Sequence, residues 1–159
     1  MSKFTSLRRR LDSKLGTLGY YAEQEQPLRA PVDVSPKVSR SIVLEMNRLG
    51  MMVDLSHVSV PTMLDAMGVS KAPVIFSHSS AHALCNSSRN VPDHALQLLA
   101  KSGGIVMVSF YPHFISCGEK STLADVAVGF YVSAHINHVR KVAGIDHVGI
   151  GAGYDGINL

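Results

Sequence analysis

Two histidines and one aspartate in this chain of 159 residues follow short apolar runs of the kind that form buried strands. His57 and His78 each come two residues after such a run, and Asp155 comes five residues after a third. In parallel α/β folds the loops after the strands face one open side, where ligands bind. Zinc accepts imidazole and carboxylate ligands, so the three residues predict a metal or catalytic site. The alternative, that each is an ordinary hydrogen-bonded loop residue, stays open.

Strands and helices alternate in the pattern beyond residue 40. Glycines such as Gly50 and Gly144 end the helical stretches, and Pro61 suits a first helical turn, where its missing N–H has no partner to lose. The predicted helices cover residues 41–49, 61–67, 93–101 and 122–142, and the predicted strands cover residues 51–55, 74–76, 105–110 and 148–150. Alternation of this kind is typical of parallel α/β architecture.

The composition is that of a globular domain. Hydrophobic residues make up 46% and charged residues 17%, which excludes a disordered chain. No apolar run approaches the ~18 residues of a membrane-spanning helix. The net charge of +3 arises in the first 20 residues, whereas a nucleic-acid-binding face needs basic residues spread over folded surface. We predict a basic, proline-containing arm at residues 1–40, one domain at residues 41–159, and no nucleic-acid partner.

The chain contains two cysteines, Cys85 and Cys117. They suit either a pair of thiols in a reducing compartment or one disulfide in a secreted protein. Their spacing alone does not choose between the two.

Four segments in collinear order resemble the zinc-dependent membrane (renal) dipeptidases. They are DLSHVS at 54–59, APVIFSHSSA at 72–81, SRNVPD at 88–93 and GAGYDG at 151–156. The likeness runs from about residue 42 to residue 159 and does not extend to residues 1–40. It implies a (β/α)₈ barrel of the metallo-dependent hydrolase type, of which this chain resembles the C-terminal half.

The resemblance also implies a site. His57 and His78 would bind one zinc ion and Asp155 the other of two, and Asp155 would also handle the proton. Arg89 would grip the terminal carboxylate of a dipeptide, a task that suits the guanidinium fork. The implied reaction is dipeptide hydrolysis by a metal-activated hydroxide.

Several features of the family are missing. Its first strand supplies a His-x-Asp pair and a middle strand supplies a bridging Glu, but no His-x-Asp occurs here and none of the four glutamates lies in a matching context. Gly153 stands where relatives usually place Asp. A barrel of this type needs ~250 residues and eight strands, whereas four are predicted. We therefore expect a truncated dipeptidase that is weak or inactive alone, or a non-catalytic fragment or isoform that binds a full-length dipeptidase.

The resemblance bears on the cysteines and the location as well. In relatives, cysteines at the positions of Cys85 and Cys117 form a disulfide. The family lies on the extracellular face of membranes and is GPI-anchored, although this sequence shows neither a signal peptide nor a GPI signal. A half barrel exposes strand edges, so self-association is expected.

Two further histidines, His135 and His138, stand three residues apart in a predicted helix. They could bind a metal, but a pair on the protein surface is the favoured interpretation.

Overall fold

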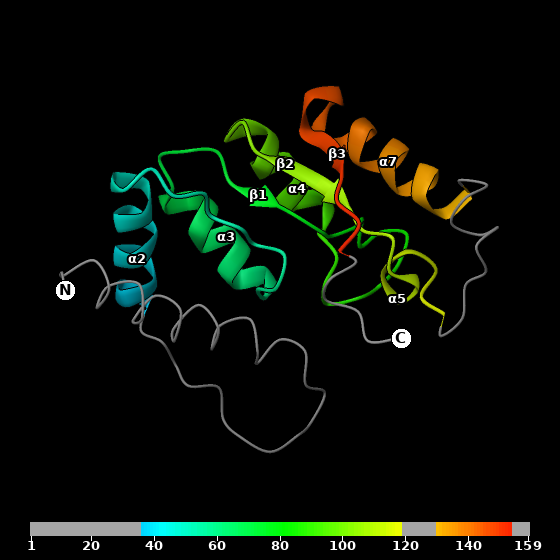
Figure 1. The fold of residues 1–159 in the computed structure, drawn as a ribbon, viewed down its shortest axis with the longest axis horizontal. Helices are drawn as coiled ribbons and strands as arrows, with labels where there is room; N and C mark the ends of the chain where they lie inside the picture. The colour runs from blue at the N-terminus through cyan, green and yellow to red at the C-terminus, as the bar shows by residue number, and fades with distance from the viewer. Residues whose placement is uncertain (1–35, 119–129, 154–159) are drawn as a thin grey trace, which may run out of the picture.

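The computed structural model describes residues 36–118 and 130–153, so Asp155 and most of the predicted N-terminal arm lie outside the described residues. Its centre is a parallel sheet in the order β1 (Ile75–Phe76), β2 (Ile105–Val108) and β3 (Val148–Ile150) (Figure 1). The pairing is parallel throughout, as the alternation of strands and helices predicted.

The predicted strand at residues 51–55 joins this sheet through a short bridge. Asp54 pairs in parallel with Ile75. The Leu55 amide donates to the Ile75 carbonyl, and the Ile75 amide donates to the Val53 carbonyl, both at 2.9 Å. All four predicted strands therefore lie in the sheet, but the first is a bridge, and β2 ends two residues before its predicted end.

The helices end close to their predicted bounds, but α2 begins at Pro36, five residues before its predicted start and inside the predicted arm at residues 1–40. They are α2 (Pro36–Arg48), α3 (Val60–Val69), α4 (Asp93–Lys101), the short α5 (Pro112–Ile115), α7 (Phe130–Ala143) and a 3₁₀ turn, η1 (Ile145–His147). Gly50 and Gly144, which follow α2 and α7, have positive φ angles of 70° and 108°, a conformation that glycine adopts without steric cost. Residues 122–129 of the predicted long helix lie outside the described residues.

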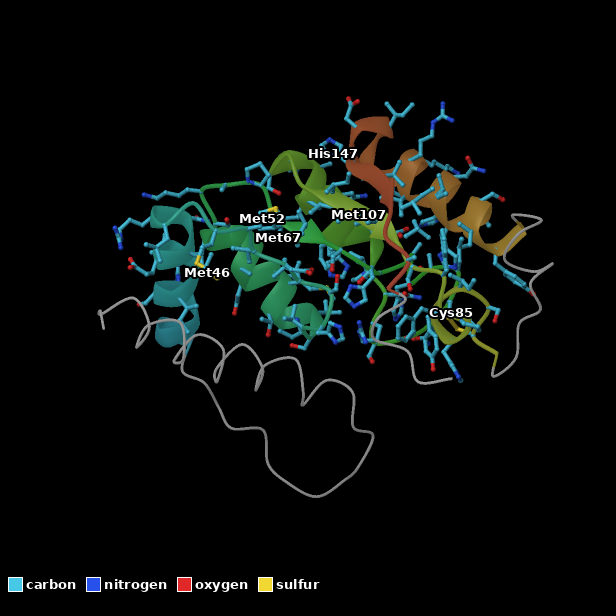
Figure 2. The ribbon with its side chains drawn as sticks, in the orientation of Figure 1. Met46, Met52, Met67, Cys85, Met107 and His147 are labelled. Carbon is cyan, nitrogen blue, oxygen red and sulfur yellow. A yellow bond between two sulfur atoms is a disulfide. The ribbon has the colours of Figure 1, made fainter. Side chains whose placement is uncertain are left out.

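One face of the sheet carries the core. Val74, Phe76, Val106 and Val108 are fully buried on the side that the helices cover. In Figure 1, α2 and α3 lie towards one end of the sheet and α7 towards the other, with α4 behind the strands. Met46 on α2 and Met67 on α3, both labelled in Figure 2, belong to the same core.

The opposite face is only partly covered by the described residues. Asp54 is exposed, and Ile75, Ile105 and Met107 are half-buried. At the edge, Ile150 on β3 is 63% exposed. Among residues 36–118 and 130–153, the sheet therefore has one well-covered hydrophobic face and one partly covered face.

No helix among residues 36–118 and 130–153 is long and apolar enough to span a bilayer.

Candidate metal centre

His57 and His78 converge at the carboxyl ends of adjacent parallel strands. Their Nε2 atoms lie 2.8 Å apart although the residues are 21 positions apart in sequence. The ring centroids are 4.8 Å apart and the rings are tilted by 58°. The structure brings these two histidines together, while their role as metal ligands and the position of Asp155 stay predictions.

Backbone hydrogen bonds hold the two histidine loops against the sheet. After β1, the Ser79 amide donates to the Met107 carbonyl at 3.1 Å and the Ser109 amide donates to the Ser79 carbonyl at 3.3 Å. The His78 amide donates to the hydroxyl of Ser56, which is buried beside His57. The backbone around His78 is thus fixed to the sheet and to the loop that carries His57.

The loop after β3 passes close to His78. A Cβ atom at Gly151 would collide with the carbonyl oxygen of Ser77, and one at Gly153 would lie 3.5 Å from the His78 side chain. Gly153 has a φ of 81°, which glycine tolerates. Glycines at these two positions therefore let the third strand end approach the histidine pair.

The Nδ1 atom of His78 belongs to a side-chain network. It lies 2.7 Å from the hydroxyl oxygen of Ser77, which in turn donates a short hydrogen bond to the Asp54 carboxylate. The same carboxylate accepts the amides of Ser56 and Ser77 at 3.0 and 3.2 Å. Partial desolvation of the Asp54 carboxylate raises its pKa, but these hydrogen bonds outweigh that effect, so its pKa lies below the usual value and the group is ionised at neutral pH.

Arg89 is buried against both imidazoles. Its Nε donates to the Ser56 carbonyl at 2.9 Å, and its guanidinium lies 4.8 Å from the centre of the Phe114 ring. One terminal nitrogen lies 3.1 Å from His57 Nε2 and 3.3 Å from His78 Nε2. A guanidinium can only donate, so each Nε2 atom is the acceptor in its contact with Arg89.

The spacing of the two histidine nitrogens is close to that of two ligands on one zinc ion. Two nitrogens on one tetrahedral zinc, each at about 2.0–2.1 Å from it, lie about 3.3 Å apart. The imidazoles would need to separate by roughly half an ångström from their 2.8 Å spacing. Within residues 36–118 and 130–153, however, no three His, Cys, Asp or Glu side chains are grouped as metal ligands.

A disulfide and a buried amide brace the segment that carries Arg89. Cys85 and Cys117 are bonded, with Cα atoms 5.4 Å apart, next to α5 (Cys85 is labelled in Figure 2). The side chain of Asn90 donates to the carbonyls of Cys85 and Phe114 and accepts the Ser80 amide. This bracing links the guanidinium to the rim of the sheet.

Sequence reasoning missed the supporting roles of Asp54, Ser77 and Asn90. Asp54 and Ser77 lie inside the quoted motifs, and the charge of Asp54 between the apolar Val53 and Leu55 was an available signal. Asn90 also lies inside a quoted motif, SRNVPD at residues 88–93, but its bracing role could not be predicted because its partners lie up to 24 residues away.

The favoured interpretation of His135 and His138 as a surface pair is wrong for His135. It is 1% exposed, accepts the Ala81 amide at Nδ1 and donates from Nε2 to the Ile115 carbonyl. Because both ring nitrogens are used by the backbone, it is a core histidine. His138 instead bonds to Asp93 at 2.8 Å.

Comparisons with known proteins agree with this geometry. Residues 36–159 match the family model of the membrane dipeptidases, peptidase family M19. Dipeptidase aclJ from Aspergillus oryzae is 45% identical over 140 residues, which cover 87% of this chain and 32% of that protein. The chain thus spans about a third of the length of this curated relative.

Solved structures give the same result. A metallopeptidase from Rhodobacter sphaeroides, liganded with a phosphinate mimic of the dipeptide L-Ala-D-Ala, is 31% identical with a TM-score of 0.68, covering 81% of this chain and 38% of its own. Dipeptidase AC, a metallopeptidase of family M19, is 34% identical with a TM-score of 0.66, and the match covers 71% of this chain and 33% of dipeptidase AC. The fold is therefore part of the barrel of metallo-dependent hydrolases, and the chain belongs to the membrane dipeptidase family of metallopeptidases.

Proposed function

We propose that this chain provides the two-histidine side of a zinc centre that hydrolyses dipeptides. The observation that carries the proposal is the convergence of His57 and His78, whose Nε2 atoms lie 2.8 Å apart at neighbouring strand ends. Neutral imidazole nitrogens are common zinc ligands.

The two remaining residues of the proposed site, Arg89 and Asp155, would hold the substrate, the second metal ion and the proton. Arg89 would bind the terminal carboxylate of the dipeptide, since a guanidinium pairs with a carboxylate through two parallel hydrogen bonds. Asp155 would bind the second of two zinc ions and accept or return the proton. The zinc ions, when bound, would lower the pKa of water and polarise the scissile carbonyl.

The relatives support the substrate class. One is a dipeptidase, and another binds a mimic of a dipeptide. Since this chain spans about a third of each, the first strand and its His-x-Asp ligands would come from a further part of the protein or from another chain, such as a second copy. The Cys85–Cys117 disulfide favours an oxidising location such as the outer face of a membrane.

Zinc content and hydrolysis of the purified chain test the proposal together. We expect weak zinc binding that is lost in His57→Ala and His78→Ala, and kept in the control His94→Ala, an exposed histidine on α4. Hydrolysis of glycyl dipeptides and of L-Ala-D-Ala should be slow or absent alone and should follow zinc content. Zinc that binds equally to His78→Ala and wild type would contradict the proposed site.

A second candidate function is non-catalytic binding to a full-length dipeptidase. The observation that favours it is the incomplete sheet face with Ile75, Ile105 and Met107 half-buried. Under this alternative, the chain would co-purify with a full-length relative and change its activity without binding zinc itself.

A further inference from the structure

The side chains of Asp54, Ser77 and His78 form one continuous hydrogen-bonded chain. The Asp54 carboxylate accepts from the Ser77 hydroxyl, and the Ser77 oxygen lies 2.7 Å from His78 Nδ1. The far nitrogen of the same ring, Nε2, faces His57 at 2.8 Å. The network therefore contacts one nitrogen of His78, while the proposed zinc ion would bind the other.

The directions of these bonds follow from counting protons. An ionised carboxylate only accepts, so the single hydroxyl proton of Ser77 must point to Asp54. The Ser77 oxygen can then only accept from His78, which places the imidazole proton on Nδ1. The Ser56 hydroxyl, 3.3 Å from the Ser77 oxygen, can donate to the remaining lone pair.

We propose that Asp54 and Ser77 are positioning residues that hold His78 in the tautomer with its proton on Nδ1, so that the Nε2 lone pair is available to a metal ion. The inference rests on the proposed function, because it takes His78 as a ligand. Metal-binding histidines commonly donate their other N–H to a carboxylate or carbonyl, which fixes the tautomer and the ring orientation. Here a serine hydroxyl stands between the carboxylate and the ring.

Replacing Asp54 with asparagine should reverse this chain of bonds. In Asp54→Asn the amide oxygen can still accept the backbone N–H groups of Ser56 and Ser77, while the NH₂ group faces the Ser77 hydroxyl and donates to it. Ser77 would then donate to Nδ1 of His78, which moves the imidazole proton to Nε2 and removes the lone pair. The shape of the side chain is almost unchanged, so the packing is preserved.

Nitrogen NMR of the metal-free full chain, with ¹⁵N-labelled histidine, reads the tautomer directly. The His78 signals are assigned by their loss in His78→Gln. We expect the Nδ1–H form in wild type, the Nε2–H form in Asp54→Asn, and a mixture in Ser77→Ala. Ser77→Thr, which keeps the hydroxyl, should restore the wild-type form, and Asp65→Asn on the exposed face of α3 is the matched control.

Zinc titration of the same variants gives the second measurement. Outer-shell substitutions typically weaken metal binding about 10–100-fold, and we expect this loss in Asp54→Asn and Ser77→Ala but not in Ser77→Thr or Asp65→Asn. An unchanged His78 tautomer in both Asp54→Asn and Ser77→Ala would overturn the inference. The two results can also differ. If the His78 tautomer changes in the variants as expected but the wild-type chain binds no zinc, the positioning role is supported and the proposed function is refuted.

Discussion

The buried positive charge of Arg89 lies beside the Nε2 atoms of His57 and His78, which are the atoms that would bind zinc. The residue is 5% exposed, and its guanidinium contacts both Nε2 atoms. A guanidinium in this place stabilises the metal-free histidine pair and opposes a second cation.

Substitution of Arg89 separates its effect on folding stability from its effect on zinc affinity. In Arg89→Met, the Ser56 carbonyl loses its charged donor, and we expect a loss of about 1–3 kcal/mol in the free energy of unfolding. Zinc affinity should rise several-fold, because the competing charge is gone. Titration calorimetry and chemical denaturation measure the two effects, with the exposed Arg140→Met as control. Zinc affinity that falls in Arg89→Met would contradict this account of the charge.

His135 predicts a pH dependence of stability. Burial lowers its pKa most, the Ile115 carbonyl raises it, and nearby His138 lowers it, so the net shift is downward. The unfolded chain therefore binds this proton more readily than the folded one. The contribution to stability is complete above the unfolded pKa of about 6.5 and is lost as the pH falls below it.

Denaturation between pH 8 and pH 5 measures that contribution. The loss of unfolding free energy with falling pH should be smaller in His135→Gln than in wild type, whereas His94→Gln, at an exposed site, should behave as wild type. An equal slope in all three proteins would show that His135 does not titrate differently on folding.

The elements were largely predictable, because glycine and proline set their ends. The predicted helix at residues 93–101 matches α4 at both ends, and Gly144 follows α7. The short α5 was missed, because four residues are too few for a periodic pattern. The first strand was overestimated, since only residues around Asp54 pair with the sheet.

Gly151 tests how tightly the end of β3 packs. A Cβ atom there would collide with the Ser77 carbonyl and lie 2.7 Å from Met107 Cβ. We expect Gly151→Ala to lower the free energy of unfolding by at least about 1–3 kcal/mol. Gly68→Ala is the control: nothing lies within 4 Å of its Cβ position in α3, so it should stabilise by up to about 1 kcal/mol. Equal stability of the two variants would contradict the close approach.

The disulfide should stabilise the segment between α5 and Arg89. Its cysteines are 32 residues apart, and closing such a loop is worth about 3–4 kcal/mol in the chain-entropy account. We expect the double variant Cys85→Ser/Cys117→Ser to lose about this amount on chemical denaturation. Adding a reductant should destabilise wild type and leave the double variant unchanged. A wild type insensitive to reductant would show that the bond is not formed in solution.

At the scale of the whole molecule, the sequence predicted which strand ends meet but not how the site is supported. Parallel strands bring their carboxyl ends to one edge, so His57 and His78 could be placed together from their positions after strands. The contacts of Arg89 with the imidazoles join residues 32 and 11 positions apart. Such contacts form only once the loops have folded, so they cannot be predicted from local sequence patterns.

The outer edge of β3 is open among the described residues. Ile150 on β3 is 63% exposed, and among residues 36–118 and 130–153 no strand pairs with the outer edge of β3. An edge strand with an exposed apolar side chain is a template for pairing with another chain. We therefore expect self-association that increases with protein concentration.

Light scattering after size-exclusion chromatography measures this association. Ile150→Lys places a charge on the edge strand and should raise the monomer fraction, because charged edges disfavour strand pairing. Leu84→Lys, at a position 46% exposed in the loop before Cys85, is the matched control and should associate as wild type does. A wild-type chain that stays monomeric at high concentration and unfolds cooperatively would show that the described edge is already protected. If Leu84→Lys reduced association as much as Ile150→Lys, general solubility rather than the edge of β3 would be the cause.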